Sequence, residues 1–381
     1  MKKWLIVLLV IIFLFTPKCA LADTNEIAMP DLSSIDSFLS ELDQDLQTEI
    51  GDFSFSGVWH QIRSGELDFD LKSILKLFLS IFLQELSVTG VLLGKLILLA
   101  IVCVFLTNLK DAFEKSDISL LSRSIVYLLL IGIAISSFNL SMEIAQGAIE
   151  SIRDFLYALL PVLMALLAAM GGAGTAAFIY SSVLFAVTVM LHLVQFFIFP
   201  LIYFSAVLAL VSRISPRFQI DKLAKLFRDI ALGLLSVSTT LFIAFIGLVG
   251  FAGASFDGLA IKAAKTAAGI FIPVVGRSLA DAMDSVLGTA LVMKNAVGVV
   301  GAIVILIICA LPAIKILVQV IVYKLAAAII QPLGENELSE ALGSIGNALL
   351  MVFAVLAICG LLFFFIIAIT IGIANVSMML R

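Results

Sequence analysis

Residues 271–294, FIPVVGRSLADAMDSVLGTALVMK, place charged side chains inside a sequence that is otherwise apolar enough for a bilayer. Arg277, Asp281 and Asp284 have the spacing i, i+4 and i+7, which is one face of a helix. An ionisable group in hydrocarbon costs roughly 2.5–3.5 kcal/mol, so such groups normally face protein or water. We therefore predict that these three residues, with Lys294 at the end of the stretch, line a polar path through the membrane. The alternative is an amphipathic turn in a surface loop.

The rest of the chain is strongly apolar. Of its 381 residues, 62% are hydrophobic and 13% are charged, whereas soluble proteins average roughly 25% charged residues. Apolar runs of about 18 residues or more recur, which is typical of transmembrane helices. The composition therefore predicts an all-α polytopic membrane protein.

Residues that carry enzyme chemistry are scarce. The sequence has two widely separated histidines, no phosphate loop and no nucleophile elbow. Asp281 and Asp284 share one segment with Arg277, whereas an intramembrane protease needs paired groups on facing helices. The four cysteines stand singly, without the spacing of a metal site or a disulfide framework: Cys19, Cys103, Cys309 and Cys359. We predict no enzyme activity, no cofactor and no metal.

The amino-terminal 22 residues have the features of a secretory signal peptide. Two lysines precede an apolar core, and an Ala-x-Ala motif ends at Ala22. We predict cleavage after Ala22, with an uncleaved anchor as the alternative. Residues 23–85 carry thirteen acidic and three basic side chains, and a shortage of basic residues is typical of exported regions. We expect an acidic extracytoplasmic region that ends in an amphipathic helix, residues 71–86, at the membrane surface or against a partner.

The apolar segments set the number of membrane crossings. Residues 86–142 predict a two-helix hairpin, and a short polar turn follows at 143–154. Two further runs, 175–212 and 296–330, are too long for one crossing, because 38 helical residues measure ~57 Å against ~30 Å of hydrocarbon. We expect the first run to turn back near its central proline, and the second also to exceed a single crossing. The total is eight transmembrane helices if residues 267–288 cross the membrane fully, and seven if they are re-entrant.

Residues 213–230 form the most basic segment of the chain, with five basic and two acidic side chains. Their apolar residues fall largely on one helical face, which predicts an interfacial helix on the cytoplasmic side. Counting crossings from an external amino terminus gives the same side. Membrane lipid is the expected contact of this helix, and no nucleic-acid-binding motif is present.

Matched prolines indicate an internal repeat. Two pairs have the same separation of 112 residues: Pro161 with Pro273, and Pro200 with Pro312. We predict two copies of one unit, residues 155–254 and 267–376, with the four prolines as helix breaks or re-entrant segments. Duplicated halves with broken helices recur in transport proteins. The alternative is a coincidence of prolines in apolar sequence, and the relative orientation of the copies, parallel or inverted, is left open.

Five segments carry a resemblance to a known family: GKLILLAIVCVFLTNL (94–109), ALLPVLMALLAAMGG (158–172), FIPVVGRSLADAMDSVLGTALVMKNAVGVVG (271–301), LPAIKILVQVIVYKLAAAIIQPLGE (311–335) and SIGNALLMVFA (344–354). They resemble the stage III sporulation protein AE family of endospore-forming bacteria, and the likeness runs from about residue 70 to 376. The resemblance implies a membrane component of the complex that connects mother cell and forespore, located in the outer forespore membrane. It also implies partners from the same operon, including a secretion-type ATPase and ring-forming proteins of the intermembrane space.

The leading hypothesis is therefore a channel or export-apparatus subunit that late forespore gene expression requires. A stand-alone secondary transporter is one alternative, supported by the repeat alone. A non-conducting membrane scaffold for the complex is another. The family defines no catalytic residues, and a homo-oligomer is left open.

Overall fold

The computed structural model describes residues 37, 40, 71–112, 117–170, 172–212, 220–256, 275–334 and 336–379. Across these residues the chain is helical and contains no strand, which confirms the all-α class. A segment that crosses hydrocarbon must satisfy its backbone N–H and C=O groups internally, and a helix does so within itself. The predicted signal peptide with Ala22, and most of the acidic region after it, lie outside the described residues.

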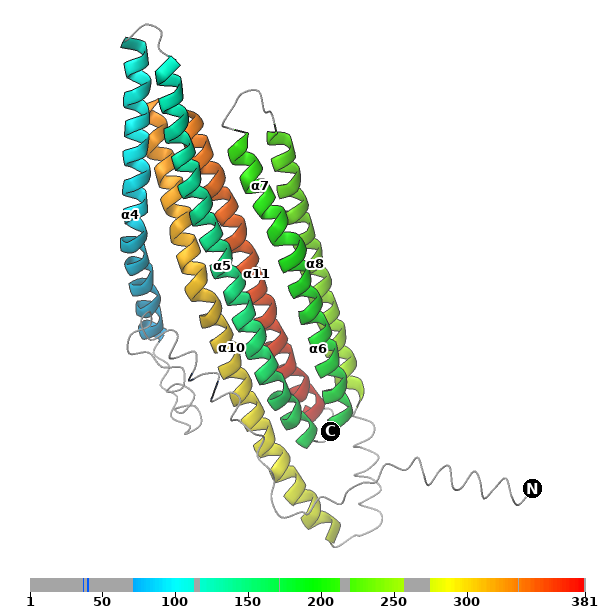
Figure 1. Ribbon diagram of the computed structural model, residues 1–381. Coiled ribbons are helices and arrows are strands. Elements are labelled where there is room, and N and C mark those ends of the chain that lie inside the picture. Colours follow the sequence, from blue (N-terminus) through cyan, green and yellow to red (C-terminus); the bar gives the residue numbers. More distant parts are fainter. Residues whose placement is uncertain are drawn as a thin grey trace, which may run out of the picture. The chain divides into compact units, whose positions relative to one another are not determined.

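Long helices run side by side in the described part of the chain (Figure 1). In chain order they are α4 (Leu71–Ala112), α5 (Asp117–Ala169), α6 (Ala173–Leu193), α7 (Phe199–Val211), α8 (Asp221–Phe256), α10 (Val275–Ile330) and α11 (Asn336–Met379). A five-residue π-helix, Val194–Ile198, joins α6 to α7. A 3₁₀ turn, Gln331–Leu333, follows α10 and ends at Gly334, whose φ of 91° lies in the left-handed region that glycine tolerates.

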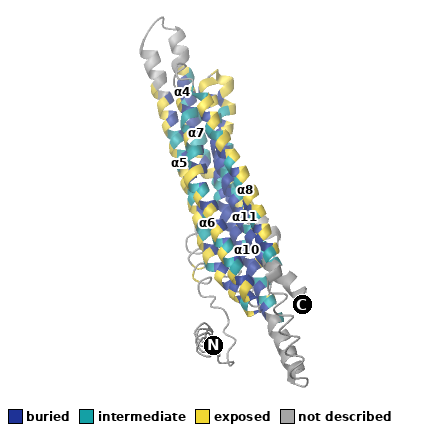
Figure 2. Ribbon diagram, turned by 90° about the vertical axis from the view of Figure 1, so that its right-hand side faces the viewer, coloured by how far each residue is buried: buried dark blue, intermediate teal, exposed yellow. Residues whose placement is uncertain are grey.

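Helices α10 and α11 are the most extensively paired elements. α4 and α5 pack against α10, and α7 and α8 pack against α11. α5 also contacts α11, so the two sides of the bundle are joined. Large apolar side chains are fully buried along these contacts, and the buried residues follow the helix–helix interfaces in Figure 2. Examples from four helical segments are Phe138, Phe155, Phe199, Tyr323 and Phe363.

Six segments are long and apolar enough to cross a membrane, which supports the polytopic class. They are Phe78–Phe105, Tyr127–Ala169, Ala173–Val211, Asp221–Ala252, Ala290–Leu333 and Asn336–Gly372. Among the described residues the number is therefore six, and the predicted seven or eight spans are not confirmed.

The hairpin predicted near Pro200 is wrong, and the second long run does not turn back either. Residues 175–212 lie almost entirely in one continuous span, Ala173–Val211, and residues 296–330 belong to α10 alone. A helix longer than the hydrocarbon can tilt or extend beyond it, so length alone does not require a turn. Pro200 lies in the first turn after the π-helix, and the π-helix changes the hydrogen-bond pattern just where proline disturbs it.

The other matched prolines do not reverse the chain where they are described. α5 continues through Pro161 and α10 continues through Pro312. Neighbouring helices can compensate for the backbone groups that a proline frees in a transmembrane helix. Pro273 lies outside the described residues. Local breaks at these prolines stay a prediction.

Two predicted boundaries fall inside helices. The polar turn expected at 143–154 is part of α5, and the amphipathic helix expected at 71–86 continues into the first span as α4. The internal repeat is not confirmed. The chain turns at Gly172 between α5 and α6, whereas the position 112 residues later lies within continuous α10. Each predicted copy does contain one pair of consecutive helices that pack against each other. The pair is α7–α8 in the first copy and α10–α11 in the second.

Candidate functional site: polar residues in the membrane-spanning helices

The predicted polar stripe lies at the start of α10. Arg277, Asp281 and Asp284 belong to this helix, but their side chains lie outside the described part of the structure. The polar path that we predict for them is therefore untested.

Lys294 is the one member of the predicted stripe whose side chain is described. It is fully buried between α10 and α11, and its Nζ donates to Thr370 O at 2.6 Å and to Ile371 O at 3.2 Å. The Thr370 hydroxyl donates to Ile366 O at 2.8 Å. A buried ammonium needs hydrogen-bond acceptors, and the α11 carbonyl oxygens supply them. Lys294 thus lies in a helix–helix contact, and its place in a polar path stays a prediction.

A glycine allows the close approach that this contact needs. A Cβ atom on Gly298, one turn after Lys294, would lie 2.4 Å from Cγ1 of Ile371. Such a distance is far shorter than carbon atoms tolerate, so only glycine fits without a shift of α11 or of the Ile371 side chain. Small residues at helix interfaces allow this close packing in membranes.

A second buried polar contact joins α5 to α10. The Ser141 hydroxyl lies in hydrogen-bond contact with the Gln319 side-chain amide, and it also lies 3.0 Å from Ser137 O. These contacts let polar groups lie in the interior without exposure to hydrocarbon.

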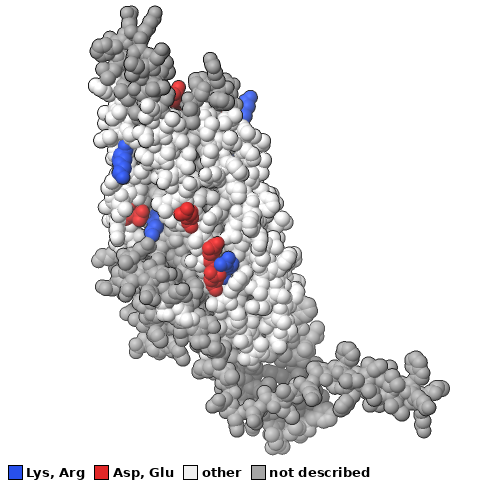
Figure 3. All heavy atoms as spheres, viewed as in Figure 1, with Lys and Arg blue, Asp and Glu red and all other residues white. Residues whose placement is uncertain are grey.

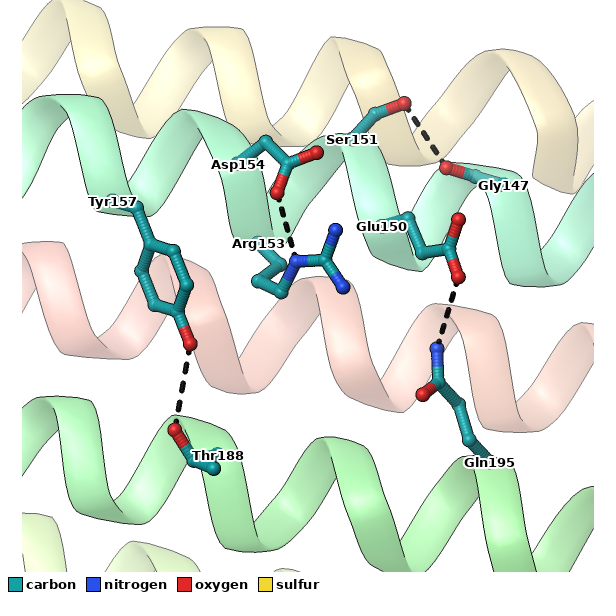
Figure 4. Close-up of polar contacts among 8 residues, drawn as sticks. All are labelled: Gly147, Glu150, Ser151, Arg153, Asp154, Tyr157, Thr188 and Gln195. Carbon is teal, nitrogen blue, oxygen red and sulfur yellow. Dashed lines mark hydrogen bonds and ion pairs between the residues drawn. The ribbon is translucent and has the colours of Figure 1, made fainter.

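A larger group of polar side chains lies between α5 and α6, and Figure 4 shows most of it. We call it the α5–α6 polar band, and it consists of Glu150, Arg153, Asp154 and Tyr157 on α5, Thr188 and His192 on α6, and Gln195 on the π-helix that follows α6. Gln195 Nε2 donates to Glu150 Oε1 at 3.3 Å, and the Tyr157 hydroxyl lies 3.4 Å from Thr188 Oγ1. Two hydrogen bonds therefore connect the helices across the band.

The remaining polar groups of the band pair within their own helix. Arg153 Nε donates to Asp154 Oδ1 at 2.8 Å, and His192 Nδ1 lies 2.7 Å from Thr188 O. Glu150, Asp154 and His192 are exposed, so much of the band faces away from the bundle. Acidic and basic side chains are accordingly visible at mid-height over α5 on a largely uncharged face (Figure 3).

The band has exposed apolar side chains beside it. Both of its segments belong to candidate spans, Tyr127–Ala169 and Ala173–Val211. Phe185 and Phe196 of the same span are exposed by 63% and 66%, as expected for side chains that face lipid. α8 packs beside α6 at this level, where its residues are almost all apolar. Charged side chains on an outer surface here must face protein or water to avoid the cost of hydrocarbon.

The sequence contains a signal for this band that our prediction of a polar turn at 143–154 missed. Polar residues recur at three- and four-residue intervals, which keeps them on one helical face: Glu143, Gln146, Glu150, Arg153 and Tyr157. A turn would have no reason to keep this period. No cluster of three or more His, Cys, Asp or Glu that could hold a metal lies among the described residues.

These features define an all-helical membrane protein with long spans and polar side chains inside the membrane-spanning segments. The family model of stage III sporulation protein AE matches residues 53–374. The chain is also 39% identical over 346 residues to stage III sporulation protein AE of Bacillus subtilis (strain 168), covering 90% of this chain and 87% of that protein. The chain belongs to the stage III sporulation protein AE family, and the predicted resemblance is confirmed. No solved structure matches it.

Proposed function

We propose that the chain is a subunit of a channel or export apparatus that links mother cell and forespore and that late forespore development requires. Membership of a sporulation family supports a role in sporulation. The observation that carries the channel is the α5–α6 polar band, because hydrogen-bonded and charged groups lie on the outside of the bundle within apolar spans. A polar surface in that position suits a wall that several chains build together.

The position of the band favours a subunit over a stand-alone transporter. Transporters that work alone bind their cargo at the interface between their own repeats. In this chain residues 155–169 of α5 meet α10 across the interface between the predicted repeats, and the contact is close and apolar, because a Cβ atom on Gly301 would lie 2.3 Å from Cδ2 of Leu159. Exposed polar groups lie instead on the outer side of α5 and α6, and Glu150, Asp154 and His192 are among them.

Location and partners follow from the family resemblance and from charge. We propose the outer forespore membrane, with the acidic amino-terminal region extracytoplasmic and cleavage after Ala22. Lys222, Lys225 and Arg228 at the start of α8 support a cytoplasmic position for that end. The proposed partners are the secretion-type ATPase and the ring-forming intermembrane proteins of the same operon.

A non-conducting scaffold is the second candidate. The observation that favours it is Lys294, which is buried in a helix–helix contact instead of in an open cavity. In a scaffold, the polar band would bind a neighbouring membrane protein and no water would pass.

The polar band can be tested in a sporulating strain whose own copy of the gene is deleted. Replacement by a Glu150→Leu, Asp154→Leu variant should leave the protein in the membrane but reduce late forespore gene expression at least tenfold. The matched control is Glu337→Leu, Glu340→Leu, which removes two exposed acids from the start of α11 and should preserve expression. If both variants support normal sporulation, sporulation does not require the charges of the band, and neither a polar path nor a scaffold contact through the band is supported.

A further inference from the structure

A small cavity with polar side chains lies where α7, α8 and α11 meet. It is close to the point where α7 ends and α8 begins, which we call the α7–α8 end of the bundle (Figure 1 shows these helices). Its volume is about 80 Å³, and a single water needs roughly 10–15 Å³ measured in this way, so a phosphate-sized group fits. Alanines and one methionine form its apolar wall. The polar side chains that line it are Ser205, Asp221, Lys225, Arg228, Ser344 and Asn347.

Two of the cavity's polar groups already donate hydrogen bonds, one between helices and one within α11. The Ser205 hydroxyl of α7 donates to Ala224 O of α8 at 2.9 Å, and the Ser344 hydroxyl donates to Glu340 O within α11 at 2.8 Å. These bonds fix the shape of the cavity, and the Asn347 amide from α11 adds a hydrogen-bonding group to its wall.

The charges of the cavity favour an anion. Arg228 lines the cavity, and its Nε and Nη2 donate to Asp229 Oδ1 at 3.1 and 3.0 Å, which orients the guanidinium. Lys225 lies one turn earlier on the same helix and is exposed. Asp221 also lines the cavity, so two cationic side chains and one carboxylate are among its lining residues, and Asp229 offsets part of the Arg228 charge from outside the lining.

The cavity also lies at the level expected for lipid headgroups. Residues 221–229 of α8 contain five charged side chains, and the helix carries no charged side chain from Ile230 onward. This change marks the boundary between water and hydrocarbon. Leu226 and Ile230 are exposed beside it, where acyl chains would lie. Basic pockets between transmembrane helices are known to bind anionic headgroups.

We propose that this cavity binds the phosphate headgroup of an anionic phospholipid, with Lys225 and Arg228 as the cationic contacts and Asn347 as a hydrogen-bonding group. The bound lipid holds the α7–α8 end of the bundle at the membrane surface. The site is independent of the α5–α6 polar band and of any transport through it.

Native mass spectrometry of the detergent-purified full-length protein tests the site. Phosphatidylglycerol should remain bound at occupancies where phosphatidylcholine does not. Lys225→Gln should lower the phosphatidylglycerol affinity about fivefold, as expected for one basic contact at a membrane surface. Lys222→Gln is the matched control, because it removes the same charge from an exposed neighbour that does not line the cavity. Equal losses in both variants would overturn the site, because they would show only general attraction to basic residues.

A second variant and a soluble competitor separate the remaining possibilities. Ala209→Leu fills the apolar wall of the cavity without a change of charge and should also reduce phosphatidylglycerol binding. Full binding by this variant would overturn the cavity as the site. If glycerol 3-phosphate displaces phosphatidylglycerol at equal concentration, the ligand is a soluble phosphate compound and the lipid assignment is wrong.

Discussion

At the level of single residues, Lys294 shows how the bundle accommodates an ionisable group. Its ammonium is buried, and the backbone oxygens of Thr370 and Ile371 accept its hydrogen bonds. The sequence pattern singled out Lys294 as a polar residue within an apolar segment. It could not predict the partners, because they lie 76 and 77 residues later and depend on how α10 and α11 are paired.

The free energy of unfolding should depend more on the volume of the Lys294 side chain than on its charge. Lys294→Met keeps most of the side-chain volume and removes the buried ammonium, so we expect little change in the free energy of unfolding. Lys294→Ala leaves a cavity and should lower that free energy by about 2–5 kcal/mol. Thermal unfolding of detergent-solubilised protein, followed by circular dichroism, compares the two. A methionine variant as unstable as the alanine variant would show that the ammonium itself holds α10 and α11 together.

Removing either partner of the Ser141–Gln319 contact should lower the free energy of unfolding by a different amount. Ser141→Ala leaves the buried Gln319 amide without its serine partner, and we expect a loss of about 1–3 kcal/mol. Gln319→Leu costs less, since the Ser141 hydroxyl can still donate to Ser137 O. Denaturation of the two single variants and the double variant measures the difference. Equal losses from both single variants would contradict this reading of the contact.

At the level of helices, two glycines of α11 allow a test of the α10–α11 packing. A Cβ atom on Gly360 would lie 2.9 Å from Cβ of Cys309 and 2.3 Å from its Sγ, whereas a Cβ on Gly343 meets nothing within 4 Å. Cys309 is short and its Cβ cannot move without the α10 backbone. The two helices must therefore separate if Gly360 gains a side chain.

Gly360→Ala should destabilise the bundle by about 1–3 kcal/mol through overpacking. Gly343→Ala is the matched control on the same helix, and it should be neutral or stabilising by up to about 1 kcal/mol because alanine favours helix over glycine. Melting temperatures of the purified variants decide between them. Equal melting temperatures would mean that α10 and α11 are not packed as closely as the structure shows.

Apolar runs predicted the class of fold, but they predicted its connections less well. Their length suggested hairpins, because we assumed that a helix ends where the hydrocarbon ends. The continuous segment Ala173–Val211 shows that it need not. The polar residues at 143–154 were interpreted as a turn by composition, although Glu143, Glu150 and Arg153 keep a helical period. Contacts such as Glu150 with Gln195 depend on the packing of α5 against α6, which no local pattern specifies.

At the level of the whole molecule, the central claim is that a polar surface on α5 and α6 belongs to a conduit built from several chains. The bundle presents apolar side chains such as Phe185 and Leu241 on its outer surface, while Asp154 and His192 are exposed at a neighbouring position within the spans. In a single chain surrounded by lipid, exposing those polar groups to hydrocarbon would cost free energy. A chain within the proposed sporulation channel avoids this cost, because water or another subunit covers the polar groups.

Thiol labelling in sporulating cells tests this claim most directly. Single cysteines at Asp154 and His192, and at Phe185 and Leu241 as lipid-facing controls, are placed in a functional background without the four native cysteines. A charged maleimide should label the cysteines at Asp154 and His192 and leave those at Phe185 and Leu241 unlabelled. Protection of all four positions would contradict a water-filled path along the α5–α6 polar band.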